Sequence, residues 1–154
     1  MVKHDTLLVC SSVPENRQEL RQVFSDTFHL LEAADARQMI LLLKQNFGCI
    51  AAVLMDVSRW EEADAQRISS EENVNILRKV PVIILSEQDT PAVLNRAFGM
   101  GAADVIPLNY DQDAMLMRIE NVIQLRLHKL RLQQYAACDL VTVRHEQHKN
   151  RRLS

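Results

Sequence analysis

Five short hydrophobic runs are distributed along the chain, and each is followed within two residues by a polar residue or a proline. Short runs of aliphatic and β-branched residues are typical of strands that are buried on both faces of a parallel sheet. We therefore predict five strands, at residues 6–10, 29–33, 49–56, 81–85 and 104–106.

The segments between these runs carry helix signals. Pro14 suits the first turn of a helix, Asp35 can cap a second helix, and Gly48 can end it. A helix of weaker pattern follows a predicted loop at residues 57–64 and ends at residue 77. The other predicted helices lie at about residues 14–26, 35–47, 90–99 and 111–135. Strands and helices thus alternate five times with short connections, which predicts an α/β fold with a doubly wound, five-stranded parallel sheet.

The third hydrophobic run ends on a carboxylate, Asp56. In open α/β sheets, ligands and chemistry lie just outside the carboxyl ends of the strands, where the protein can hold a functional acid on a rigid strand end. Aspartate is also common where a loop begins. From this run alone the functional and the structural interpretation of Asp56 are equally favoured.

Composition restricts the class of protein. The chain has 154 residues, of which 47% are hydrophobic and 25% are charged, so we predict one globular domain with a short appendage. No apolar run approaches the ~20 residues of a membrane span, and the N-terminus lacks the pattern of a signal peptide. We expect a cytoplasmic protein with no membrane partner.

The cysteines do not indicate a disulfide framework or a zinc site. Cys10, Cys49 and Cys138 are an odd number, and no CxxC spacing occurs. If the strands that carry Cys10 and Cys49 are parallel neighbours, the two residues lie about 20 Å apart, too far for a disulfide. We expect the cysteines to be small buried residues.

The last predicted helix is longer than one layer over a sheet requires. Its apolar residues recur at steps of three and four, at Leu116, Ile119, Ile123, Leu127 and Leu130. A stripe that continues past the sheet needs another partner, and a second copy of the same helix is the simplest one. We therefore predict a homodimer, with a domain at residues 1–125 and a helical extension and polar tail at residues 126–154.

The tail is basic although the whole chain carries a net charge of −2. Residues 126–154 contain seven Lys or Arg and two acidic residues, a local charge of +5. The tail has no recognisable DNA-binding motif and only Tyr135 as an aromatic residue, so nucleic-acid binding is not favoured. We assign no structure to residues 144–154.

Five motifs in the right order resemble the receiver domain of two-component response regulators over residues 5–125. They are Pro14–Arg17 at the first helix, Asp56 after the third strand, the fourth-strand entry at 80–83, Ser86, and Gly101–Asp104 before the fifth strand. The resemblance implies a flavodoxin-like sheet of strand order 2-1-3-4-5. It also implies that Asp56 stands at the phosphoacceptor position and Ser86 at the position of the hydroxyl that binds the phosphoryl group.

The chain departs from the receiver pattern where the chemistry needs charge. The family's acid pair, which holds Mg²⁺, is replaced by Ser11 and Ser12, and its lysine and cis-proline by Leu108 and Asn109. Phosphoryl transfer needs cations that neutralise the charge on the transferring oxygens, and Mg²⁺ prefers carboxylate ligands. We therefore expect no resident cofactor, weak binding of Mg²⁺ and a trans Leu108–Asn109 peptide. The fifth strand carries Val105 where the family has an aromatic switch residue.

The sequence thus predicts an atypical receiver that is no enzyme: a regulatory and dimerisation module whose ordinary Mg²⁺-dependent phosphorylation is weakened or lost. One alternative is a working phosphorelay receiver, phosphorylated on Asp56 by a histidine kinase. Another is the N-terminal domain of a receiver–diguanylate cyclase type protein, because residues 135–142 of this chain loosely resemble the linker of such proteins. A doubly wound enzyme or flavin binder is disfavoured because the chain has three glycines and no phosphate-binding glycine-rich loop. The partners implied are a histidine kinase or an output domain.

Overall fold

The computed structural model describes residues 5–87 and 90–153, and of residue 93 and residues 137–153 it describes the backbone alone. Its strands are β1 (Thr6–Cys10), β2 (His29–Ala33), β3 (Ile50–Asp56), β4 (Val82–Ser86) and β5 (Asp104–Pro107). Its helices are α1 (Pro14–Phe24), α2 (Ala36–Gln45), α3 (Glu62–Ser69), α4 (Glu71–Leu77), α5 (Pro91–Gly99) and α6 (Gln112–Leu153), with a short 3₁₀ helix, η1 (Phe47–Cys49). The five predicted strands are confirmed to within one or two residues.

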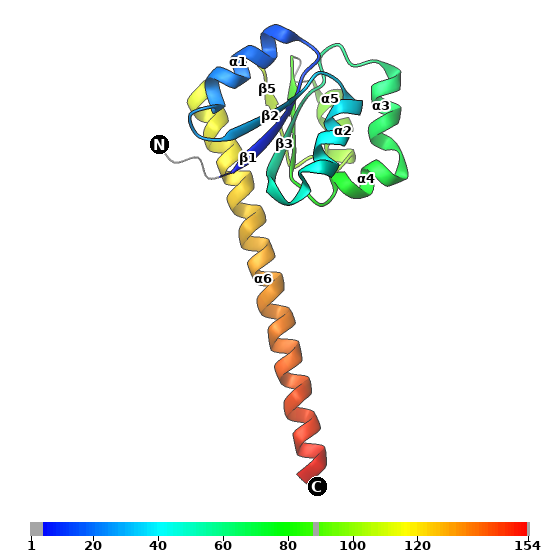
Figure 1. Cartoon of the computed structure of the whole chain (residues 1–154), viewed down its shortest axis with the longest axis vertical. Helices are drawn as coiled ribbons and strands as arrows, with labels where there is room; N and C mark the ends of the chain where they lie inside the picture. The colour runs from blue at the N-terminus through cyan, green and yellow to red at the C-terminus, as the bar shows by residue number, and fades with distance from the viewer. Residues whose placement is uncertain (1–4, 88–89, 154) are drawn as a thin grey trace. The chain divides into compact units, whose positions relative to one another are not determined.

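The strands form one parallel sheet of order β2-β1-β3-β4-β5. Helices α2 to α5 lie on one side of this sheet, and α1 with residues 112–122 of α6 lies on the other (Figure 1). Both faces of the sheet are therefore covered, which explains why the inner strands β1, β3 and β4 are hydrophobic along most of their length instead of alternating, whereas the edge strands β2 and β5 also carry Glu32 and Asp104. The predicted α/β fold and the strand order 2-1-3-4-5 are confirmed.

Local sequence signals set the ends of the first helices. Pro14 occupies the first turn of α1, where a missing backbone N–H costs no hydrogen bond. The carboxylate of Asp35 caps α2 by accepting a hydrogen bond from the backbone N–H of Gln38 at 2.8 Å. Both helices begin three or four residues after a strand ends, and this proximity places the first turn of α1 beside the carboxyl edge of the sheet.

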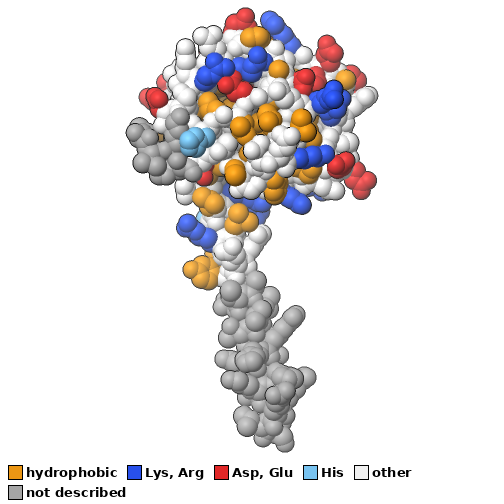
Figure 2. All heavy atoms as spheres, in the orientation of Figure 1, with side chains coloured by type: hydrophobic (Ala, Val, Ile, Leu, Met, Phe, Trp, Pro, Cys, Tyr) orange, Lys and Arg blue, Asp and Glu red, His pale blue; other side chains and the backbone are white. Residues whose placement is uncertain are grey.

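Two clusters of the core lie on the side of the sheet that α2 to α5 cover. Leu8, Val53 and Met55 pack with α2, whereas Ile84 and Val105 form a smaller cluster with α5. On the face of the domain in view in Figure 2, hydrophobic side chains gather near the centre, with acidic and basic side chains around them. This face of the domain therefore presents apolar as well as charged side chains to solvent.

The predicted helix that ends at residue 77 is two helices. The chain breaks at Ser70, whose ψ of 146° is extended, so that α3 ends at Ser69 and α4 begins at Glu71. Helix α3 also begins earlier than expected, at Glu62, because Glu61 and Asp64 form a reciprocal capping box around the first turn. Its acidic N-terminal residues were predicted to be loop, and that prediction is wrong.

Helix α6 is longer than predicted, since it continues past residue 135 to Leu153. The chain divides into two compact units, Met1–Val122 and Ile123–Ser154. Among the predicted stripe residues, Ile119 and Ile123 are buried and Leu116 is half-buried. Leu127 and Leu130 are exposed by 39% and 37%. Within the part of the chain that the structure describes, no helix is long and apolar enough to cross a membrane.

The cysteines differ in their surroundings. Cys10 is buried at the end of β1, and burial above all raises the pKa of its thiol to about 12, so that it stays protonated at neutral pH. Cys49 is exposed, because it belongs to η1, which precedes β3 at the opposite edge of the sheet. The prediction that Cys49 is buried is therefore wrong. The side chain of Cys138 lies outside the described residues.

Candidate functional site

Five predicted site residues lie at the carboxyl edge of the sheet. Ser11 and Ser12 follow β1, Asp56 ends β3, Ser86 ends β4, and Leu108 follows β5. The strand register aligns these ends, since Asp56 pairs with the residue before Ser86 and the backbone N–H of Leu108 donates to the carbonyl of Ser86 at 2.9 Å. In doubly wound sheets this edge holds the functional site.

The carboxylate of Asp56 is fully buried and accepts three hydrogen bonds. Ser11 Oγ donates to Asp56 Oδ2 at 2.6 Å, and Asn16 Nδ2 donates to the same oxygen at 2.9 Å. The backbone N–H of Ser58 donates to Asp56 Oδ1 at 2.9 Å. Each carboxylate oxygen thus has a partner, as a buried acid requires.

These three donors are neutral, and their placement bears on whether a metal ion fits. Ser11 and Asn16 both donate hydrogen bonds to Asp56 Oδ2, so they occupy the lone pairs that a bound cation would need. Ser11 and Ser12 supply no negative charge, which Mg²⁺ sites draw from carboxylates. Among the residues that the structure describes, no group of three or more His, Cys, Asp or Glu could hold a metal. The residues around Asp56 therefore fit Mg²⁺ poorly.

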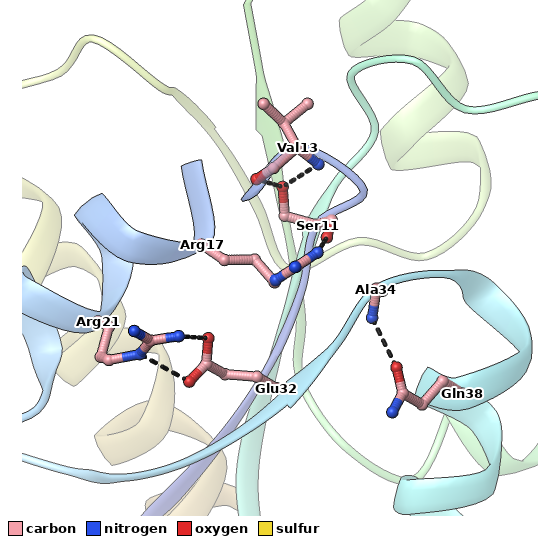
Figure 3. Close-up of polar contacts among 7 residues, drawn as sticks. All are labelled: Ser11, Val13, Arg17, Arg21, Glu32, Ala34 and Gln38. Carbon is pink, nitrogen blue, oxygen red and sulfur yellow. Dashed lines mark hydrogen bonds and ion pairs between the residues drawn. The ribbon is translucent and has the colours of Figure 1, made fainter. Parts of the chain in front are cut away.

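The loop after β1 is held in place by hydrogen bonds within the loop and by the guanidinium group of Arg17 (Figure 3). Arg17 Nη1 donates to the carbonyl of Ser11 at 2.7 Å, and the Ser11 hydroxyl contacts the backbone N–H and carbonyl of Val13 at 3.2 and 3.3 Å. Nearby, Arg21 forms a bidentate ion pair with Glu32 at 2.8 Å. The contacts with Arg17 and Val13 hold Ser11 in the loop from which its hydroxyl reaches Asp56.

Ser12 connects the same loop to the segment that follows Asp56. Its hydroxyl is half-buried and donates to the carbonyl of Ser58 at 3.2 Å. The backbone N–H of Ser58 donates to Asp56, so the hydrogen bond from Ser12 to the Ser58 carbonyl helps to hold that donor in position. Ser11 and Ser12 thus both take part in holding Asp56 in place.

The loop after Asp56 contains unusual backbone and unpaired polar atoms. Arg59 has a φ of 59°, in the left-handed region that non-glycine residues rarely adopt. Its side chain is exposed. Ser58 Oγ and Trp60 Nε1 are covered from solvent and have no hydrogen-bond partner among the described residues. Such features are costly, and they often occur at functional segments.

The strain at Arg59 leads to a prediction. Left-handed backbone costs a non-glycine residue about 1–2 kcal/mol, whereas a glycine adds about 0.4–1 kcal/mol of unfolded-state entropy. Arg59→Gly should therefore raise the free energy of unfolding by about 0.5 kcal/mol in urea titrations. The matched control is Arg78→Gly, another exposed arginine but with a φ of −68°. Arg78→Gly should lower the free energy of unfolding. If both variants lower it by the same amount, the backbone of Arg59 is not strained.

Ser86 and Leu108 complete the edge on the other side of Asp56. Ser86 is buried, and Leu108 is half-buried at the position where the receiver pattern has a lysine. The Leu108–Asn109 peptide is trans. Val105, at the position of the aromatic switch, is buried against Ile84 and the neighbouring α5. Leu108, at the position where the resemblance to receivers predicts a lysine, thus carries a half-buried aliphatic side chain.

Sequence reasoning missed three residues of the site. Asn16 and Ser58 are direct partners of Asp56, and Trp60 packs on the core below the same loop. A signal for Asn16 was present, because a helix that begins at Pro14 right after β1 brings its first turn to the carboxyl edge. The Ser58 contact is made by backbone, which the identity of the residue does not encode.

Comparisons with solved structures agree with the fold. No family model and no curated protein matches the sequence. A receiver domain from Methanospirillum hungatei has a TM-score of 0.69 at 12% identity, with 81% of this chain and 98% of that one covered. The receiver domain of NarL from Mycobacterium tuberculosis has a TM-score of 0.66 at 19% identity, with 80% and 98% covered.

A third similar structure is a complex of CheX, CheY, BeF₃ and Mg²⁺ from Borrelia burgdorferi, with a TM-score of 0.66 at 21% identity and coverage of 78% and 90%. The chain has the receiver-domain fold. At these identities the likeness establishes the fold, and the site must be judged on its own residues. Within this fold Asp56 ends β3, and the groups that donate hydrogen bonds to its carboxylate are neutral.

Proposed function

We propose that this chain is a regulatory receiver-fold module that signals without ordinary Mg²⁺-dependent phosphorylation of Asp56. The observation that carries the proposal is the donor set of the carboxylate, which is fully buried and held by a hydroxyl, an amide and a backbone N–H. Asp56 would then be a structural acceptor that joins β3 to the loop after β1 and to the first turn of α1.

The chemistry of phosphoryl transfer supports this proposal. A phosphoryl group that approaches Asp56 would need in-line access, a cation at its equatorial oxygens and a metal bound beside the carboxylate. Access would require Ser11 and Asn16 to leave Asp56 Oδ2, since both occupy it. Leu108 carries no charge to replace the lysine of ordinary receivers. Each missing element would slow the reaction independently.

A module of this kind would act through protein contacts. The exposed leucines of α6, among them Leu127 and Leu130, support self-association, with a histidine kinase or an output domain as further candidate partners. A working receiver is the second candidate, because Asp56 and Ser86 still end adjacent strands in the arrangement that phosphorylation would use. The two candidates differ in whether Asp56 reacts.

The test is treatment of the protein with acetyl phosphate and, separately, with beryllofluoride, each with Mg²⁺. We expect no phosphoryl adduct in the intact mass and no shift of the Asp56 backbone amide in NMR spectra. Mg²⁺ alone should not saturate a site in the low-millimolar range. An adduct that Asp56→Asn removes would establish the second candidate and reject the first.

The control restores the missing charges by combining Ser11→Asp, Ser12→Asp and Leu108→Lys. Since Ser11 Oγ lies 2.6 Å from Asp56 Oδ2, an acid at position 11 places two carboxylates together. Without Mg²⁺ the variant should be less stable than wild type, and Mg²⁺ should restore part of that stability, because it binds the folded acid pair. Beryllofluoride should then bind. If the folded variant binds Mg²⁺ but still no beryllofluoride, missing charge is an incomplete explanation and the loop at residues 57–60 becomes the cause.

A further inference from the structure

The face of the sheet covered by α3, α4 and α5 is hollowed. Two adjoining hollows of about 520 and 590 Å³ lie among these helices and strands β3 and β4. They belong to one groove, because they share the lining residues Glu62, Ala65, Ile68, Ile84, Arg96 and Met100. Volumes of about 300–1,000 Å³ are typical of small-molecule sites.

The groove exists because the helices above it cover the sheet incompletely. Helix α4 has no fully buried residue, and Ala97 is the one buried residue among the described side chains of α5. The floor is apolar nevertheless, with Met55 and Ile84 from the sheet and Ile68 from α3. The groove is open to solvent, so an apolar occupant would remove part of its apolar lining from water and add dispersion contacts to it.

The polar groups of the groove point to an uncharged occupant with a hydrogen-bond acceptor. Two acids, Glu61 and Glu62, and two cations, Arg78 and Arg96, line it, so its formal charge is balanced. Trp60 also lines it, and its indole nitrogen has no acceptor among the described residues. That nitrogen is covered from solvent, so the indole ring would have to rotate before its N–H could reach a molecule in the groove. A change in the strained backbone conformation of the adjacent Arg59 would allow this rotation.

We propose that this groove binds a small, uncharged molecule with an apolar, aromatic-sized body and one carbonyl-type acceptor, which accepts a hydrogen bond from the indole of Trp60. The body would lie over the floor formed by Met55, Ile68 and Ile84 and against the partly exposed Val57, Leu77 and Met100, and the acceptor would face the loop after Asp56. The site is separate from the carboxylate of Asp56, so the proposal holds whether or not Asp56 can be phosphorylated.

The first test uses prodan, a neutral naphthyl ketone whose emission reports an apolar environment. Protein is titrated into a fixed, low concentration of prodan, and we expect a blue shift with a Kd on the order of 100 µM. Ala65 is exposed and lines both hollows, so Ala65→Phe should weaken binding about tenfold or more by filling the groove. Ala63→Phe is the matched control, since Ala63 is exposed on the same helix and lines neither hollow. It should leave binding unchanged.

The second test examines the indole directly. The chain has one tryptophan, so its indole N–H gives a single NMR cross-peak. Acetophenone, a soluble neutral ketone, should displace prodan and move this peak downfield, and Trp60→Phe should weaken prodan binding about three- to tenfold through the lost hydrogen bond.

Three results would overturn the proposal. The first is the absence of prodan binding, and the second is equal binding by Ala63→Phe and Ala65→Phe. The third is a wild-type self-association that Ala65→Phe abolishes, because the groove would then be covered by a second copy of the chain.

Discussion

Asp56→Ala should lower the free energy of unfolding by about 2–4 kcal/mol, because it leaves buried donors without an acceptor. Ser11 Oγ, Asn16 Nδ2 and the backbone N–H of Ser58 all direct their hydrogens at this carboxylate. Ser11 could turn to the carbonyl of Val13, which already lies 3.3 Å away, so the loss is smaller than three full penalties.

The sign of this effect separates the two candidate functions. In a working acid pocket several carboxylates repel one another, so that removing one relieves strain and can stabilise the fold. Here Asp56 contacts neutral donors, and its removal has no repulsion to relieve. Burying one carboxylate is costly in itself, yet hydrogen bonds to a charged group are worth about 1.5–3 kcal/mol each. Three of them outweigh that cost.

Asp56→Asn refines the comparison, since it keeps the shape and removes the charge. One of its two terminal atoms becomes an NH₂ group, which must face a donor on one side or the other. We expect a loss of about 1–2 kcal/mol, smaller than for alanine. Urea unfolding monitored by circular dichroism measures both variants, with Asp26→Ala as the control for loss of an exposed carboxylate. A gain in stability for either Asp56 variant would contradict the structural role that we propose for it.

Much of the fold could be predicted because its signals are local. The hydrophobic runs identified all five strands, since strands buried on both faces contain few polar residues. Pro14 and Asp35 marked the starts of α1 and α2 through one missing N–H and one capping carboxylate. The place of Asp56 at a strand end followed from the same pattern, because a charged residue ends a buried run.

What could not be predicted depends on contacts between distant segments. Asn16 and Asp56 are 40 residues apart, and no spacing indicates that they meet. The break at Ser70 and the groove above β3 and β4 arise from how α3 to α5 pack, which periodicity does not describe. The extent of α6 was underestimated because its polar C-terminal part lacks an apolar stripe, although polar residues such as Arg and Gln are good helix formers.

The remaining prediction concerns self-association: the protein should be a dimer at about 50 µM that Leu127→Glu with Leu130→Glu dissociates, with a rise in Kd on the order of 100-fold or more. Leu127 and Leu130 are exposed by 39% and 37% on one face of α6. Fully burying a leucine contributes about 1.5–3 kcal/mol. In a twofold pair each leucine counts twice, so even partial burial offsets much of the entropy lost on association. Glutamates would add like charges to the same contact.

A matched pair of leucines on the same helix provides the control. At 100° per residue, Leu125 and Leu132 lie on the face of α6 opposite Leu127 and Leu130, and they are exposed by 70% and 56%. Leu125→Glu with Leu132→Glu adds the same charges and removes the same apolar groups, but should leave the dimer intact. Sedimentation velocity of the three proteins gives the answer. A monomeric wild type would reject association through α6, and dissociation by the control pair alone would place the interface on the opposite face of the helix.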